Sequence, residues 1–325
     1  MFFLILAAVV AFLICVGLAS VTIPFLRKLN FGQSIREEGP QEHRKKSGTP
    51  TMGGVVIIAT VVIVMLALAI CSKIYGFSEA NLGENIFLVL FLFVGYGLVG
   101  FADDYIKVVM KRNLGLTSKQ KLLGQVIIAL GFILLSSNDT SLWLPIANIT
   151  VDIGIFYYLL VICLLIGTTN AVNLTDGLDG LAAGAVIPVA AAYLIIALQP
   201  FTLSLAVFAV AIIGACTGFL LFNFNPAKVF MGDTGSLALG GGVAALALLT
   251  KTELLLVVIG GLFVVEALSV ILQVISFKST GKRIFKMSPI HHHFELSGWS
   301  ERKVVLVFWF VSSIFSLLGL YIWSI

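Results

Sequence analysis

Two adjacent carboxylates stand where a long apolar stretch ends. The run Phe-Ala-Asp-Asp-Tyr places Asp103 and Asp104 directly after charge-poor residues. Neighbouring carboxylates repel unless a cation or a proton neutralises one of them, and their oxygens suit Mg²⁺ bound together with substrate phosphates. The pair therefore predicts a metal and phosphate site at a helix end, with an interfacial acidic cap as the alternative.

A second polar run, Asn-Ala-Val-Asn-Leu-Thr-Asp-Gly-Leu-Asp-Gly, begins at Asn170. On a helix, steps of three residues keep side chains on roughly one face, so we expect Asn173, Asp176 and Asp179 to present one amide and two carboxylates together. An EF-hand loop is an alternative for such a run, but the bidentate Glu at its twelfth position is missing. A polar substrate-binding surface is favoured over a solvated turn.

A third run, Phe-Met-Gly-Asp-Thr-Gly-Ser, starts at Phe230 and leads directly into an apolar stretch. Gly232 and Gly235 permit a tight loop whose amides, with the following helix N-terminus, can receive a phosphate. Asp233 is alternatively an ordinary helix cap, and the Gly-Lys-Ser/Thr of a P-loop is missing. By itself, the run leaves a phosphate seat and a plain helix start as alternatives.

Three of the four histidines are consecutive, at 291–293. Consecutive side chains point in different directions, so we do not expect one metal ion bound by all three. Contact with a phosphate or substrate, or proton transfer by one imidazole, is favoured over a structural polar loop. Glu266 lies within an apolar stretch, where a carboxyl group is costly unless it is paired or protonated. A structural role for it, bonded to Gln273 or to a neighbouring helix, is favoured over lining a cavity.

The basic residues between Arg27 and Lys46 precede a glycine-rich helix entry. Most of them are expected to set membrane topology and to contact anionic headgroups. Lys46 and Thr51 lie nearest to the glycines, and they are therefore the candidates for substrate contact.

Ten charge-poor stretches must position these runs. Of the 325 residues, 59% are hydrophobic and 11% are charged, against about 25% charged in a soluble domain. With about 20 apolar residues needed for each spanning helix, this composition indicates an integral membrane protein and excludes a soluble enzyme with one anchor. The stretches are Phe2–Leu26, Gly53–Cys71, Ile86–Ala102, Leu122–Leu135, Ile153–Val172, Leu181–Leu198, Phe201–Phe222, Leu237–Leu249, Leu254–Phe277 and Val304–Ile325.

The positions of the basic residues decide whether all ten stretches span. With ten spans and both termini outside, 18 of the 20 Lys and Arg residues lie on the inner face, as the positive-inside rule requires. The inner total falls to 12 without a span at Leu122–Leu135, and to 13 without one at Leu237–Leu249. We therefore predict an all-α polytopic membrane protein, residues 1–325 forming a single transmembrane catalytic domain whose active site is on the cytoplasmic face.

The polar runs, taken together, resemble the motifs of the polyprenyl-phosphate N-acetylhexosamine-1-phosphate transferase family. They occur in the same order between Lys45 and Glu295, and ten spans with both termini outside also match. The histidine run is particularly similar to the branch that uses a muramoyl-pentapeptide substrate. The matching runs are Lys-Lys-Ser-Gly-Thr-Pro-Thr-Met-Gly-Gly, Phe-Ala-Asp-Asp-Tyr, Asn-Ala-Val-Asn-Leu-Thr-Asp-Gly-Leu-Asp-Gly, Phe-Met-Gly-Asp-Thr-Gly-Ser and Pro-Ile-His-His-His-Phe-Glu.

This resemblance implies transfer of phospho-MurNAc-pentapeptide from UDP-MurNAc-pentapeptide to undecaprenyl phosphate in the bacterial cytoplasmic membrane. The products are UMP and undecaprenyl-diphospho-MurNAc-pentapeptide (lipid I), a peptidoglycan precursor. It further implies Mg²⁺ bound by Asp233, a lipid phosphate oriented or deprotonated by Asp103 and Asp104, and His291 near the phosphates as a fourth catalytic residue. Around the substrates it places Lys46, Thr51, Lys111, Lys121, Asn173, Asp176, Asp179, Phe230, Gly232, Ser236 and His292. Because a lipid phosphate is largely ionised near neutral pH, its direct attack is favoured over a covalent aspartyl intermediate.

Other functions stay open at this point. A related transferase with a simpler UDP-sugar shares most of the chemistry, whereas a cation-coupled transporter prefers ionisable residues near the bilayer midplane, where Glu266 alone lies. A scaffold gives no reason for the polar runs. Membrane lipid is expected as a partner and nucleic acid is not. A homodimer is compatible with the apolar spans, although no motif signals one.

Overall fold

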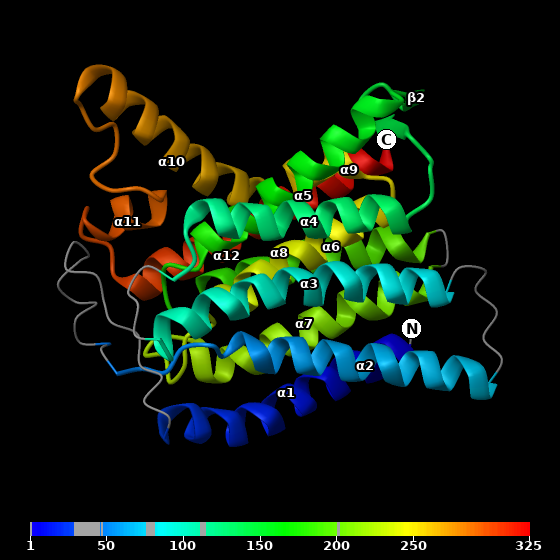
Figure 1. Cartoon of the computed structure of the whole chain (residues 1–325), viewed down its shortest axis with the longest axis horizontal. Helices are drawn as coiled ribbons and strands as arrows, with labels where there is room; N and C mark the ends of the chain where they lie inside the picture. Colours follow the sequence, from blue (N-terminus) through cyan, green and yellow to red (C-terminus); the bar gives the residue numbers. More distant parts are fainter. Residues whose placement is uncertain (1, 29–45, 47, 76–81, 111–114, 200–201) are drawn as a thin grey trace.

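The computed structural model describes residues 2–28, 46, 48–75, 82–110, 115–199 and 202–325. Most of this part of the chain is helical, and one small β-hairpin interrupts it (Figure 1). The helices are α1 (Phe2–Lys28), α2 (Gly54–Tyr75), α3 (Leu82–Val108), α4 (Ser118–Leu135), α5 (Ile155–Thr175), α6 (Leu181–Leu198), α7 (Leu203–Asn223), α8 (Gly232–Leu249), α9 (Glu253–Ile259), α10 (Gly261–Thr280), α11 (Ile290–Glu295) and α12 (Glu301–Ser324).

Ten of these helices, all but α9 and α11, are long and apolar enough to cross a membrane. The predicted number of spans is thereby confirmed, including the two short stretches, which belong to the 18-residue helices α4 and α8. The two ends of the chain lie at the same end of the helix bundle, away from α11 (Figure 1). Which membrane face each end occupies stays a prediction.

The ninth predicted span is broken. Leu254–Phe277 was expected to be one helix, but α9 ends at Ile259 and α10 begins at Gly261. Gly261 packs against the ring of Phe315 so closely that a Cβ atom would overlap it. From this break, α10 leaves the bundle at an angle and reaches the end where α11 lies (Figure 1).

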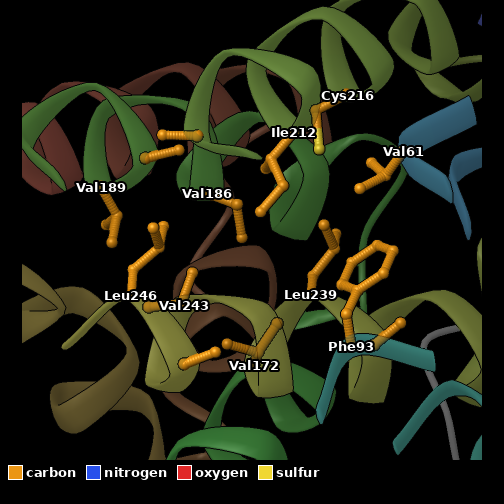
Figure 2. Packing of buried hydrophobic residues seen from close by; sticks show 14 of the residues in the cluster. Val61, Phe93, Val172, Val186, Val189, Ile212, Cys216, Leu239, Val243 and Leu246 are labelled. Carbon is orange, nitrogen blue, oxygen red and sulfur yellow. The ribbon is translucent and has the colours of Figure 1, made fainter. Parts of the chain in front are cut away.

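Helix α8 forms the centre of the bundle, and 83% of its spanning segment is buried. Its glycines allow close helix packing: Gly240 lies against the backbone of Thr169 in α5, and Gly241 against Tyr96 in α3. Helix α8 packs against α2, α3, α5, α6, α7 and α9, and its start therefore lies among several helix ends. Figure 2 labels Val61, Phe93, Val172, Val186, Val189, Ile212, Cys216, Leu239, Val243 and Leu246 in this packing.

The hairpin consists of β1 (Ser141–Leu144) and β2 (Ile149–Asp152), which pair antiparallel with Ser141 opposite Asp152. It lies at the end of the bundle opposite α11 (Figure 1). Just before it, Asp139 forms an ion pair with Lys251 at 3.1 Å. This contact ties the hairpin to the connection between α8 and α9.

Candidate active site

Three carboxylates converge at the end of the bundle where α3 finishes and α8 starts. Asp103, Asp104 and Asp233 each offer an oxygen, and these oxygens lie within 4.8 Å of one another. Both residues of the Asp-Asp pair are buried. We call this group the carboxylate centre; it brings together two of the predicted motifs.

The Asp104 carboxylate caps α8. Its Oδ2 accepts hydrogen bonds from the Thr234 N–H at 2.9 Å and the Thr234 hydroxyl at 2.6 Å, and its Oδ1 accepts the Asp233 N–H at 3.2 Å. A helix N-terminus has free N–H groups that bind an anion. Here a carboxylate of α3 fills that place and engages the N–H groups of Asp233 and Thr234, which is the arrangement of a capped helix start.

Two lysines neutralise the carboxylate centre. Lys107 forms ion pairs with Asp103 and with Asp233, the latter at 3.1 Å, while Lys121 lies 2.9 Å from the same Asp233 oxygen. Lys121 was a predicted site residue, but Lys107 was not. The signal for Lys107 was its spacing from Asp103, since a carboxylate and a lysine four residues apart on a helix pair with each other.

Asn173 orients Asp233 from the far side. Its Nδ2 donates to Asp233 Oδ1 at 2.9 Å and to the Ser236 hydroxyl at 2.8 Å, and its Oδ1 accepts from Lys121 Nζ at 3.1 Å. Ser236 in turn donates to the Gly232 carbonyl at 3.0 Å. The predicted residues Asn173, Ser236 and Lys121 therefore share one hydrogen-bonded network with the carboxylate centre.

The donor set of the carboxylate centre fits a hard divalent cation. Carboxylate oxygens are the ligands that Mg²⁺ accepts, usually one or two of them together with water and substrate phosphates. Asp233 and Asp103 supply such oxygens, and two ammonium groups already lie against them. Because the carboxylates bind two lysine ammonium groups in this structure, the same oxygens are suited to a metal ion that is bound together with an anionic substrate.

Gly232 is required by its surroundings. Its φ of +73° lies in the left-handed region that favours glycine. A Cβ atom there would lie 2.5 Å from Asp104 Oδ2 and 2.8 Å from Thr51 Oγ1. Thr51 is buried beside it, and the backbone of Phe230 pairs with the same segment, its N–H donating to the Pro50 carbonyl at 2.8 Å. Three predicted residues thus meet at the entry to α8.

The second polar run does not share one helix face. Helix α5 ends at Thr175, and Asp176 caps it with its N–H donating to the Asn173 carbonyl at 3.2 Å. A turn follows, and Gly180 has a φ of +81°. The predicted single face is therefore wrong, because the helix ends at Thr175, before Asp176 and Asp179. Asp176 is half-buried. Its burial, followed by the negative charges of the nearby aspartates, raises its pKa well above the usual range.

Asp179 belongs to a separate group, which we call the Lys46 cluster and which also contains Lys46, Asn225 and Glu301. Lys46 Nζ lies 2.8 Å from Asp179 Oδ1 and 2.5 Å from Glu301 Oε1. Asn225 donates to Glu301 Oε2 at 2.7 Å, and the Asp179 N–H donates to Glu301 Oε1 at 2.9 Å. Sequence reasoning missed Asn225 and Glu301, since no motif marks the start of the last span.

The histidine run forms the short helix α11. His291 is fully buried, and its Nδ1 lies 3.0 Å from Glu266 Oε1 of α10. His292 Nδ1 lies 2.8 Å from Glu295, and the His291 and His292 ring centroids are 4.2 Å apart. Of the two partners considered for Glu266, Gln273 and a neighbouring helix, the structure has the second, since His291 belongs to α11. The remaining predicted residue, Lys111, lies outside the described residues.

The fold and the site together define a membrane-embedded enzyme that acts on an anionic substrate at one end of its helix bundle. A family model described as glycosyl transferase family 4 matches residues 86–251, and a phospho-N-acetylmuramoyl-pentapeptide-transferase signature matches residues 46–58. The chain belongs to the phospho-N-acetylmuramoyl-pentapeptide-transferase family, as near full-length relatives of that name show.

The similar relatives come from several bacteria. The protein of Bacillus cytotoxicus is 58% identical over 322 residues, which cover 98% of this chain and 97% of the relative. Those of Bacillus mycoides and Oceanobacillus iheyensis are each 57% identical over 322 and 323 residues, with the same coverage. The chain is therefore a transferase, located in the bacterial cytoplasmic membrane. This finding favours the enzyme over the transporter and scaffold alternatives.

Proposed function

We propose that the chain transfers phospho-MurNAc-pentapeptide from UDP-MurNAc-pentapeptide to undecaprenyl phosphate. The observation that supports this most directly is the carboxylate centre with Lys107 and Lys121, because acidic and basic groups from three helices meet at one end of a membrane bundle. A metal-bound diphosphate and a lipid phosphate both require such a place. The name of the relatives supplies the identity of the transferred group.

We further propose that Mg²⁺ is the cofactor and that Asp233 is its principal ligand, with Asp103 beside it. When bound there, the ion would screen the phosphates and stabilise charge on the leaving diphosphate oxygen. The chain supplies the rest of the electrostatics: Lys107 and Lys121 hold positive charge at Asp233, and Asn173 fixes the carboxylate from the other side.

The reaction we propose is a direct displacement. An oxygen of the lipid phosphate attacks the phosphorus that carries the sugar, and the bond from that phosphorus to the bridging diphosphate oxygen breaks, so that UMP leaves. The attacking phosphate is already largely ionised, since its second pKa is about 6, and no proton has to be removed. Asp104 is engaged by the start of α8, and we assign it the positioning of Asp233 instead of proton removal.

The remaining predicted residues are proposed to hold the donor substrate. Lys46 and Asp179 pair with each other in the Lys46 cluster, and Thr51 lies at the entry to α8 with Phe230. Asp176 and the histidines lie beyond the end of α5. In this structure Lys46 is paired with Glu301 and Asp179, so an anionic donor has to compete with these two carboxylates for its ammonium group.

The test is release of UMP by the purified chain in detergent. We expect release from UDP-MurNAc-pentapeptide only when undecaprenyl phosphate and Mg²⁺ are both present, and none after chelation. UDP-GlcNAc in place of the donor separates the alternative with a simpler sugar nucleotide. Substrate flux through proteoliposomes without conversion would instead support a transporter. A single catalytic domain over residues 1–325 and a homodimer stay predictions, to be tested by domain truncation and by light scattering.

A further inference from the structure

Glu266 and His291 form a fully buried pair outside the carboxylate centre. Both side chains have 0% exposure, and Glu266 Oε1 lies 3.0 Å from His291 Nδ1. They come from different elements, α10 and α11, and stand 25 residues apart in sequence. A carboxyl group in the spanning part of a helix is costly without a partner, so this pairing explains why Glu266 is tolerated there.

The other ring nitrogen of His291 points away from Glu266. It faces the turn that follows Asp176, where a Cβ atom at Gly177 would overlap His291 Nε2. Among the described residues, no group forms a hydrogen bond with this buried Nε2 or with the second oxygen of Glu266. Buried polar atoms are normally hydrogen-bonded, so these two atoms distinguish the pair from most buried polar groups of the described residues.

The contact with Glu266 bears on the tautomer of the His291 imidazole. An ionised carboxylate only accepts hydrogen bonds, so with Glu266 ionised the nitrogen that faces it, Nδ1, carries the proton. The hydrogen bond at one ring nitrogen thereby sets the role of the other. Nε2 is then directed at the Asp176 turn, either as an acceptor or, in the imidazolium form, as a donor to an anionic group.

Gln273 holds the chain segment that leads to the histidines. It lies two helical turns after Glu266 and donates to the Phe285 carbonyl at 2.9 Å. Its Oε1 accepts the N–H groups of Ile284 and Phe285, both at 2.9 Å. Two buried polar side chains on one helix thus hold α11 and the segment before it, and only Glu266 contacts a histidine ring directly.

We propose that Glu266 is a positioning residue for the transfer reaction, which acts by fixing the ring of His291 with Nε2 directed toward the Asp176–Gly177 turn. This inference rests on the transferase function proposed above. It assigns to Glu266 no contact with substrate; its effect passes entirely through His291. A purely structural role for Glu266 predicts a different outcome in the following experiment.

The experiment is a double-mutant cycle measured by single-turnover UMP release with the purified chain in excess over UDP-MurNAc-pentapeptide. Glu266→Ala is expected to lower the rate about 10- to 100-fold, by analogy with the loss of groups that orient metal-bound histidines. Glu266→Gln is expected to recover most of the rate, because its amide oxygen still accepts the Nδ1–H. In the His291→Ala background, Glu266→Ala should cost little more, because residues that act through one another are non-additive.

Ser269→Ala is the matched control on the same helix, since the Ser269 hydroxyl only donates to the Glu266 carbonyl at 2.7 Å. It should leave the rate unchanged. Equal losses from Glu266→Ala with and without His291, or a loss as large in Ser269→Ala, would overturn the proposal. A wild-type chain that releases no UMP would instead overturn the proposed function.

A second measurement does not depend on activity. The ¹⁵N resonances of labelled histidine report which ring nitrogen carries the proton. The two ring-nitrogen resonances that are missing from the spectrum of His291→Gln are those of His291. We expect the Nδ1–H form, or the imidazolium, in the wild type and in Glu266→Gln, and a change of tautomer in Glu266→Ala. Unchanged His291 resonances in Glu266→Ala would contradict the proposal.

Discussion

The Thr234 hydroxyl donates to Asp104 Oδ2 at 2.6 Å, and the Thr234 N–H donates to the same oxygen at 2.9 Å. The two residues are 130 positions apart in sequence. A carboxylate at the end of α3 therefore serves as the N-terminal cap of α8. Since Asp233 is the residue before Thr234, this cap determines where the Asp233 carboxylate lies.

Loss of the hydroxyl should weaken this junction. Thr234→Val keeps the shape of the side chain and removes one hydrogen bond to a buried carboxylate, a change that costs about 1.5–3 kcal/mol. We expect a lower midpoint of thermal unfolding in detergent and slower UMP release. Thr217→Val is the control, because the exposed Thr217 hydroxyl donates only to the Ile213 carbonyl of its own helix at 2.7 Å. Equal stability of both variants would contradict the assignment.

A methyl group at Gly232 should disrupt the site. Gly232→Ala introduces about 1–2 kcal/mol of left-handed backbone strain and drives a Cβ atom to 2.5 Å from Asp104 Oδ2. Because a displacement of about 1 Å can cost about 100-fold in rate, we expect a loss of that size in UMP release.

Gly281→Ala separates backbone strain from this clash. Gly281 has a φ of +70°, but a Cβ atom there has no neighbour within 4 Å. It should lose a similar amount of stability to strain and keep its transfer rate. If Gly232→Ala and Gly281→Ala release UMP equally fast, the close approach of Gly232 to Asp104 does not affect the transfer reaction.

Replacement of the principal metal ligand should change the Mg²⁺ requirement. For Asp233→Asn we expect the Mg²⁺ concentration at half-maximal UMP release to rise at least about tenfold, the lower end of the losses caused by changes around metal ligands. Asp139→Asn alters a carboxylate that pairs with Lys251 at the opposite end of the bundle, and its Mg²⁺ dependence should match the wild type. An unaltered Mg²⁺ titration of Asp233→Asn would remove the metal assignment.

Lys46 should affect the donor substrate selectively. Lys46→Met removes a charge-assisted contact, and a loss of about 1.4 kcal/mol corresponds to a tenfold higher KM. We expect that rise for UDP-MurNAc-pentapeptide and little change in the KM for undecaprenyl phosphate. Lys228→Met removes an exposed lysine from the α7–α8 connection and should leave both values unchanged. A rise confined to the lipid substrate would move Lys46 to the acceptor side.

The positions of the spans and of the polar runs follow from the sequence by itself. Whether a segment can span the membrane depends on the hydropathy of about 20 consecutive residues. The lysines and arginines that flank the segment bias its orientation across the membrane. For this reason even the 18-residue helices α4 and α8 were correctly predicted as spans. The gathering of Asp103, Asp104 and Asp233 at one interface follows as well, because each lies at the end of a predicted span.

Only the tertiary structure decided which polar groups pair. Lys46 contacts Glu301, which is 255 residues away in sequence, and Asp233 contacts Lys107, which is 126 residues away. Whether such residues meet depends on how whole helices pack. The break at Gly260 directs α10 so that Glu266 reaches His291. Hydropathy does not reveal this break, since the sequence on both sides of it is apolar. The bilayer sets the spans through local composition, whereas the site arises from contacts between residues that the chain keeps far apart.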